Sequence, residues 1–339
     1  MKSLLRLLLK SQHPRNRFGP AQTDKGMTLV ELLVGSIMAF LIITPMLAFV
    51  VDMLNTDRRE QVKSNTEQDL QAAVDFIAQD LSQAIYIYDK KGIVAVNSSP
   101  TLGKFPAPPN GTPILVFWKR QQIKNSVPMN PQAGQPKDCT SDNCNDTYVL
   151  SLVAYYQFKE TDPNSIWCQP SGGLCPTRIA RYEIRDGVRN PSTLAYYTDT
   201  EAKPTQIKDK AFNDKFEISK PTENVTLGGG LFDPPEVLVN YIDHSTTGVP
   251  DPPECKTILG VTDPPAPAPA LTQADLLIAD PSTKSFYACV DTSKNIARVT
   301  IRGNSLRRIQ AQGAEFKSTS SAYFPTATVQ VQGLGARGK

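Results

Sequence analysis

The chain has 339 residues, enough for one large domain or two of modest size. Its 36 basic and 33 acidic side chains leave a net charge of only +3, and the first 26 residues hold six of the basic side chains beside a single acid. Because the rest of the chain is close to neutral, it lacks the broad positive field of a nucleic-acid-binding protein, and we expect no nucleic-acid partner.

An apolar run from Met27 to Val51 follows this basic leader. It contains one charged residue, Glu31, and a helix of this length rises about 1.5 Å per residue, enough to cross a bilayer core of about 30 Å. A signal peptide has a shorter apolar core of about 7 to 15 residues and an A-x-A-like site, which this run lacks. The sequence therefore predicts a single membrane span, with the basic leader in the cytoplasm and the body outside.

Six cysteines lie in the predicted outward-facing body, in a compartment where disulfides are favoured. Their spacing favours pairing in sequence order, although six cysteines allow 15 connectivities. The predicted pairs are Cys139 with Cys144, Cys168 with Cys175, and Cys255 with Cys289. The alternative is a zinc site made by the first two pairs, but their C-x4-C and C-x6-C spacings lack the tight C-x2-C of zinc ribbons. We expect neither a metal nor another cofactor.

Glu31 needs an explanation, because an acid in an apolar span costs about 2.5 to 3.5 kcal/mol at the helix centre and less near its end. One interpretation is that the side chain reaches the cytoplasmic interface and has no further role. The other is that it pairs with a cation in the membrane. Cleavage after Gly26 would supply that cation as the new amino group of Met27.

The residues from Lys25 to Leu33 resemble the leader of type IV pilins and pseudopilins. The resemblance implies that a prepilin peptidase cuts between Gly26 and Met27 and that the new Met27 amine is methylated. It also implies that Glu31 pairs with a terminal amine during assembly. Pro45 fits the kinked first helix of that family, although membrane helices tolerate proline in general.

The helical pattern continues beyond the apolar run. The stretch from Asn55 to Asp69 is polar and lacks both Gly and Pro, so nothing in it ends a helix. Apolar residues then recur every three or four positions, on one helical face: Leu70, Val74, Ile77, Leu81, Ile85 and Tyr88. We predict one helix from about Thr28 to Asp89, with its second half packed on a globular domain.

Beyond Lys91 the pattern changes to β-branched and aromatic runs with period two. The predicted strands are Ile114–Trp118, Tyr148–Phe158, Ile179–Arg185, Val237–Ile242, Phe286–Val290, Ile296–Ile301 and Thr326–Val331, with a short helix within Leu271–Ala279. Long loops are expected at 125–146, 186–230 and 243–271, the last with a stiff Pro-rich run. Without a βαβ rhythm the sheet is antiparallel and the fold class is α+β, a pilin-like long helix on an antiparallel β-sheet domain.

Four regions follow from these patterns and from the resemblance. Residues 1–26 are a cytoplasmic leader that is removed, and residues 27–53 are the transmembrane half of the first helix. Residues 54–89 are its extracytoplasmic half, and residues 90–339 form the β-rich domain.

Residues that could support catalysis are few, and we expect no enzyme. Gly228–Gly230 lacks the Lys-Ser/Thr of a P-loop and the spacing of a dinucleotide fold, and is interpreted as a turn. His244 lies between Asp243 and Ser245, but adjacent residues on a strand point to opposite faces, which argues against a catalytic triad. His244 is interpreted as a loop or surface histidine.

Basic residues gather near the carboxyl end: Arg298, Arg302, Arg307 and Arg308, with Lys284 and Lys294 upstream. They are interpreted as a solvated strand face. The alternative is a surface at Arg302, Arg307 and Arg308 that binds a polyanion or a partner.

Further stretches narrow the resemblance. Asn55–Gln61, Ile85–Asp89 and Ala288–Asp291, followed by Arg302–Asn304, resemble the C-type pseudopilins of cyanobacterial hormogonium polysaccharide secretion. This resemblance implies a minor pseudopilin in a type IV pilus-like filament that supports polysaccharide export and gliding motility. Because the body is large, a tip or low-abundance position is expected.

The implied partners are the prepilin peptidase, other pilins or pseudopilins through the first helix, an inner-membrane assembly platform and the secreted polysaccharide. The implied location is the inner (plasma) membrane, with a periplasmic body that joins an envelope filament after assembly. The alternatives are a J-type pseudopilin of type II secretion, a W-type minor pilin and, in another class, a single-pass anchored binding protein or hydrolase.

Overall fold

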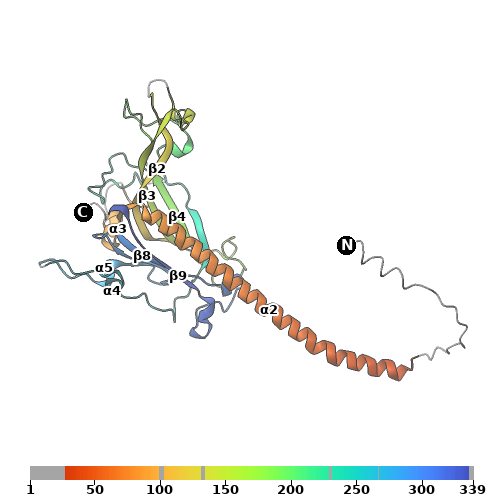
Figure 1. The fold of residues 1–339 in the computed structure, drawn as a ribbon. Coiled ribbons are helices and arrows are strands. Elements are labelled where there is room, and N and C mark those ends of the chain that lie inside the picture. The colour runs from red at the N-terminus through yellow and green to blue at the C-terminus, as the bar shows by residue number, and fades with distance from the viewer. Residues whose placement is uncertain (1–26, 99–102, 131–133, 229–230, 266, 336–339) are drawn as a thin grey trace, which may run out of the picture. The chain divides into compact units, whose positions relative to one another are not determined.

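The computed structural model describes residues 27–98, 103–130, 134–228, 231–265 and 267–335 (Figure 1). The chain divides into two compact units, residues 1–56 and residues 57–339. Helix α2 (Leu29–Ser82) belongs to both. In the first unit the described side chains are all exposed, as expected for a segment without a core of its own.

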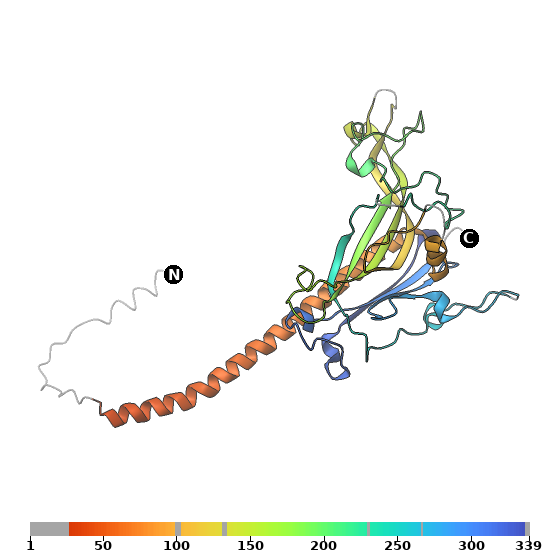
Figure 2. The ribbon, with the colours of Figure 1, turned by 180° about the vertical axis from the view of Figure 1, so that it is seen from behind.

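The second unit contains two antiparallel sheets (Figures 1 and 2). The first has the order β1-β2-β3-β4-β5, with strands Ala84–Ile87, Gly111–Pro128, Cys144–Lys159, Thr177–Arg185 and Glu236–Ile242. The second has the order β6-β7-β8-β9, with strands Leu277–Ala279, Phe286–Asp291, Ile296–Arg302 and Thr326–Gln332. The α+β class with antiparallel sheets is confirmed.

Short helices connect the strands. Those with α geometry are α3 (Lys90–Ser98), α4 (Cys255–Leu259) and α5 (Gln273–Leu276). Those with 3-10 geometry are η1 (Pro136–Asp138), η2 (Pro204–Gln206), η3 (Leu306–Arg308) and η4 (Ser318–Tyr323).

The second half of α2 packs on both sheets through one apolar stripe. Leu70, Val74, Ile77 and Leu81 are at most 1% exposed and share a single core cluster with residues of both sheets. Fully burying a side chain of this size is worth about 1.5 to 3 kcal/mol, so the stripe holds the helix on the domain. The predicted docking of this half is confirmed.

The predicted end of the helix at Asp89 is wrong. Helix α2 ends at Ser82, and the alternating Ile-Tyr-Ile after it forms β1, which pairs with β2. The helical pattern of apolar residues continues beyond Ser82 to Ile85 and Tyr88. The β-branched and aromatic side chains of this stretch suit an edge strand equally well, and pairing with β2 selects the strand. Asp89 instead accepts a hydrogen bond from the Gly92 N–H at 2.7 Å and so starts α3, a helix that the sequence pattern did not predict.

All seven predicted strands are present. The strands β2 and β3 are longer than predicted, so the loop expected at 125–146 is shorter and connects a long hairpin. The segment predicted as a short helix at 271–279 forms α5 and then the short strand β6.

Candidate functional site

The first turn of α2 is closed by two side chains that bond each other. The N–H and the hydroxyl of Thr28 each donate to Oε2 of Glu31 at 3.1 Å, and the Glu31 N–H donates to the Thr28 hydroxyl at 3.3 Å. This is a capping box, which satisfies N–H groups that lack intrahelical partners at a helix start. The helix therefore begins at Leu29, directly after Thr28, whereas Gly26 lies outside the described residues.

The capping box uses only one oxygen of the Glu31 carboxylate. Among the described residues Oε1 has no hydrogen-bond partner, and no cationic side chain pairs with Glu31. One carboxylate oxygen is thus left as an acceptor for a donor from outside the described residues. The pattern Thr28-x-x-Glu31 is itself a capping-box signal, which could have predicted this geometry from the sequence.

The apolar part of α2 satisfies its own polar groups. The Ser36 hydroxyl donates to the Leu33 carbonyl and the Thr44 hydroxyl to the Phe40 carbonyl, both at 2.8 Å, as an apolar medium requires. The helix continues through Pro45. By length and composition α2 could form a single membrane span, a test that a signal sequence would also pass.

A buried acid fixes the second half of the same helix. Asp80 is 7% exposed and receives the Lys119 ammonium at Oδ1 and the Arg181 guanidinium at Oδ2, both at 2.8 Å. The Tyr155 hydroxyl donates to Oδ2 at 2.6 Å. Glu183 completes the group through Arg181 at 2.8 Å and Lys119 at 3.3 Å. This cluster joins α2 to β2, β3 and β4, and the sequence analysis did not identify it.

The charges in this cluster stabilise the ionised acids. Burial acts to raise the pKa of Asp80, but the positive charges of Arg181 and Lys119 outweigh it and lower that pKa below its ordinary value. The pKa of Glu183 is lowered in the same way. Burial and the nearby Asp80 charge raise the pKa of Tyr155, so its hydroxyl stays protonated and donates.

The predicted basic surface is wrong for two of its three members. Arg302 is buried, and its guanidinium pairs with Asp243 at 2.9 Å. Arg307 is 0% exposed. Arg308 is half-buried and pairs with Asp69 of α2. Because the guanidinium groups of Arg302 and Arg307 are used inside the domain, these two residues contribute neither to a solvated face nor to a docking surface for a polyanion.

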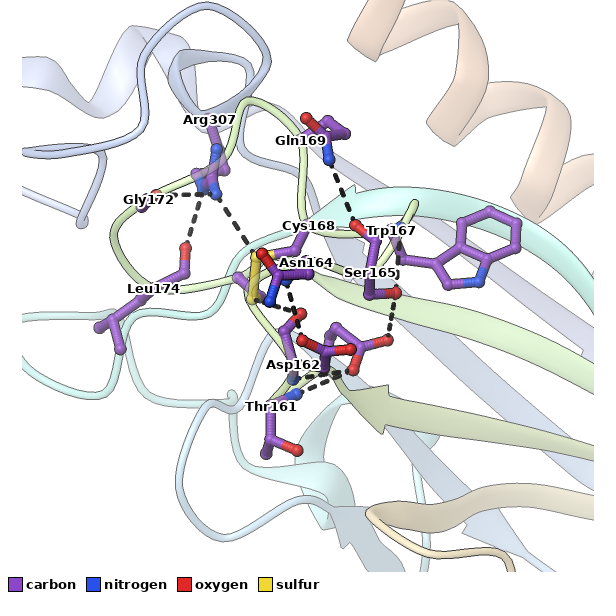
Figure 3. The surroundings of a disulfide bond; sticks show 12 residues. Thr161, Asp162, Asn164, Ser165, Trp167, Cys168, Gln169, Gly172, Leu174 and Arg307 are labelled. Carbon is purple, nitrogen blue, oxygen red and sulfur yellow. Dashed lines mark hydrogen bonds between the residues drawn. A yellow bond between two sulfur atoms is a disulfide. The ribbon is translucent and has the colours of Figure 1, made fainter.

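Arg307 instead holds the loop of the second disulfide (Figure 3). Its Nε donates to the Leu174 carbonyl at 2.8 Å, and its Nη2 contacts the Gly172 carbonyl at 3.3 Å and Cys168 Sγ at 3.7 Å. Planar guanidinium groups suit such multiple acceptors. The contacts join η3 to the loop between β3 and β4, and the bonded residues are 133 to 139 positions apart in the sequence, so no local pattern could reveal them.

His244 lies in the loop after β5, as one part of its interpretation had it, but it is not a surface residue, because it is only 8% exposed. Burial lowers its pKa. Asp243 Oδ1 accepts the Ser245 hydroxyl at 2.6 Å, and that hydroxyl in turn accepts the Phe316 N–H at 2.6 Å. Within the described residues His244 makes no hydrogen bond to Ser245, so the three neighbours do not form a nucleophile and base.

The cysteines form three disulfides in the predicted sequential pairs, which rules out the zinc alternative. The Cα–Cα distances are 5.4 Å for Cys139–Cys144, 4.8 Å for Cys168–Cys175 and 5.4 Å for Cys255–Cys289. The first closes the end of the β2–β3 hairpin and the third joins α4 to β7. In the described part of the chain no group of three or more His, Cys, Asp or Glu side chains is placed to hold a metal ion.

Comparisons with protein-family models, with curated proteins and with solved structures found no match to this chain.

Proposed function

We propose that this protein is a pilin-like filament subunit, anchored in the membrane by the first part of α2 until it is assembled. The observation that carries the proposal is Glu31, the single charged residue of the apolar run Met27–Val51, which keeps one carboxylate oxygen without a partner among the described residues. The α+β body, with a helix that continues from the apolar segment onto antiparallel sheets, supports the same architecture.

In this proposal Glu31 provides the driving force for incorporation. In lipid its charge is unfavourable by up to about 2.5 to 3.5 kcal/mol, less near the helix end. Cleavage between Gly26 and Met27 creates an amine on Met27, two residues before the first residue of α2. An amine from a neighbouring subunit would meet Oε1 while Thr28 retains Oε2, so pairing relieves part of the cost without opening the capping box.

The narrower role is that of a minor pseudopilin supporting polysaccharide secretion and gliding motility, in the inner membrane with a periplasmic body. It rests on the resemblance of Asn55–Gln61, Ile85–Asp89 and Ala288–Asp291 to the C-type pseudopilins of that system. The body beyond Thr56 is large, which favours a tip or low-abundance position over repeated side-by-side packing. The prepilin peptidase, the assembly platform and other pilins are the proposed partners.

The amino terminus and intact mass of the membrane-extracted protein test the proposal. We expect a chain that starts at methylated Met27 when an active prepilin peptidase is present, and an uncut chain when it is absent. A chain that remains uncut in both cases, or one cut after Val51, would contradict the proposal and favour an anchored or released binding protein.

A further inference from the structure

Arg307 is a buried cation for which the described chain supplies no acid. The residue is 0% exposed, its Nη1 has no hydrogen-bond partner, and no carboxylate of the described residues forms an ion pair with it. Buried charges are normally paired, because removing a charge from water is costly. The buried Arg302 follows this rule, since Asp243 neutralises it. The position of Arg307 therefore needs another explanation.

The guanidinium of Arg307 lies against a disulfide sulfur (Figure 3). Its Nη2 is 3.7 Å from Sγ of Cys168. Within the described part of the chain no cationic side chain hydrogen-bonds to a sulfur of Cys139–Cys144 or of Cys255–Cys289. The neutral sulfur of a disulfide is only a weak acceptor and does not compensate a full positive charge. A thiolate at the same position would compensate it.

The two sulfurs of this disulfide have opposite surroundings. Cys168 is 0% exposed and has the guanidinium at its sulfur. Cys175 is half-buried, and its sulfur lies 3.8 Å from the carbonyl oxygen of Asp162. A positive charge stabilises a thiolate, whereas a carbonyl oxygen favours a thiol that can donate to it. The site therefore fits a reduced state with a thiolate at Cys168 and a thiol at Cys175.

The half-buried sulfur lies beside an exposed loop. All residues from Ser171 to Leu174 are exposed, and Leu174, the neighbour of Cys175, offers an apolar contact to a protein reactant. In each of the other two disulfides both cysteines are at most 6% exposed. Thiol–disulfide exchange requires access to the attacked sulfur, so Cys175 is the sulfur that an external thiolate reaches first.

We propose that Cys168–Cys175 is a thiol–disulfide exchange site, which a protein dithiol reduces by attack on Cys175 while Arg307 stabilises Cys168 as the leaving thiolate. In the first step a thiolate of the dithiol bonds to Cys175 Sγ, the bond between the two cysteines breaks, and its electron pair leaves on Cys168. In the second step the other sulfur of the dithiol gives up its proton and attacks the dithiol's own sulfur in the mixed disulfide. This releases Cys175, which takes the proton. The dithiol is oxidised to a disulfide, and the site is reduced to one thiolate and one thiol.

Arg307 shifts this equilibrium toward the reduced site. In the disulfide form its charge is buried without a counter-charge, and in the reduced form it gains the Cys168 thiolate as a partner. A group that stabilises the reduced form makes a disulfide easier to reduce. The inference does not depend on the proposed filament function, because the site can be measured whether or not the chain is processed at Met27.

The equilibrium with dithiothreitol, a small dithiol, tests the proposal in the detergent-solubilised full chain. Free thiols are trapped by alkylation and assigned by peptide mass mapping, over a series of ratios of reduced to oxidised dithiothreitol. We expect Arg307→Gln to need a ratio about ten-fold higher than wild type to open Cys168–Cys175, since an adjacent cation lowers a thiol pKa by about one unit or more. The other two disulfides serve as internal references and should not change.

The direction of this change separates the proposal from a merely structural role. If Arg307 only holds the loop, its loss would free the disulfide and leave the required ratio unchanged or lower. Arg308→Gln is the matched control, because Arg308 lies on the same η3 but pairs with Asp69. It should leave all three disulfides unchanged.

The attacked sulfur can be identified without any variant. Glutathione, a monothiol, can form the mixed disulfide but has no second sulfur of its own to resolve it. After brief exposure and alkylation, we expect glutathione on Cys175 and the alkyl group on Cys168. Unfolding curves check that Arg307→Gln folds. If it does not, the glutathione result decides the test, together with Arg307→Lys, which keeps the positive charge and should stay close to wild type.

Two results would overturn the proposal. The first is an Arg307→Gln variant whose Cys168–Cys175 disulfide opens at the same ratio as wild type or at a lower one. The second is glutathione found on Cys168, equally on both cysteines, or on neither, which would mean that Cys168 is not the leaving thiolate.

Discussion

Helix α2 carries two acids in opposite environments, Glu31 in its first turn and Asp80 in its last. Asp80 is buried, and Lys119, Arg181 and Tyr155 supply all that its carboxylate needs. Glu31 is exposed within an apolar run, and Thr28 engages only one of its oxygens. An acid that the chain itself neutralises stabilises the fold, whereas an acid that the chain leaves partly unsatisfied awaits a partner. The comparison indicates that Asp80 stabilises the fold, and it supports the proposed role of Glu31 in assembly.

The largest expected effect is on assembly. Glu31→Leu removes the acid, and we expect filament incorporation to be lost while the three disulfides and the unfolding curve of the body remain unchanged, because among the described residues the Glu31 side chain hydrogen-bonds only to Thr28. The measurement is the amount of the variant in sheared filament fractions. Thr28→Val is the matched control, since it loses the hydroxyl cap but keeps the acid and should still incorporate. Normal incorporation of Glu31→Leu would mean that assembly does not need this acid, which would contradict the proposed difference between Glu31 and Asp80.

The largest expected effect on stability comes from the other acid. Asp80→Asn leaves Lys119 and Arg181 buried with a single carboxylate, Glu183, and loss of one member of a buried ion pair costs about 3 to 5 kcal/mol. Chemical unfolding of the full chain in detergent measures this loss. Asp75→Asn is the control on the same helix, because Asp75 is exposed and its change should stay within about 0.5 kcal/mol. Equal effects of the two variants would show that the cluster does not hold the helix.

The stabilising effect of Asp80 should also depend on pH. Its pKa is lowered in the folded state, so its contribution is present above the unfolded-state pKa of about 3.9 and is lost as the pH falls through the folded-state value. The free energies of unfolding of wild type and Asp80→Asn should therefore converge below about pH 4. Urea titrations from neutral pH to pH 3 measure this, and a difference that stays constant over that range would argue against an ionised Asp80.

The smallest effect is expected for a third acid of α2. Asp69 is half-exposed and pairs with Arg308, and such surface pairs are worth about 0 to 1 kcal/mol. A double-mutant cycle of Asp69→Asn and Arg308→Gln should give a coupling energy in that range. A coupling energy of several kcal/mol would mean that this pair stabilises the fold as much as the buried cluster does. The contrast between exposed and buried acids would then not hold.

Much of the fold could be predicted because its signals are local. The apolar run, the stripe from Leu70 to Leu81 and the period-two runs each report a periodicity that secondary structure imposes directly. The first two disulfides also followed from spacing, because cysteines five and seven residues apart close short loops. Cys255 and Cys289, 34 residues apart, were then the remaining pair. The predicted end of α2 was wrong because local periodicity is ambiguous there. The residues from Ala84 to Ile87 fit both the helical and the strand period, and only pairing with β2 decides between the two.

Sequence patterns alone were enough to predict the apolar helix, the single charge within its apolar run and the antiparallel character of the body, because each is signalled by residues close together in the chain. Which charged side chains are buried, and what they pair with, could be learned only from the folded arrangement of the strands and loops. Arg302 and Arg307 look like surface residues in a linear pattern, yet Asp243 and the carbonyls of the 168–175 loop surround them. Burial and charge pairing join residues far apart in the chain, so they follow from the fold and not from local periodicity.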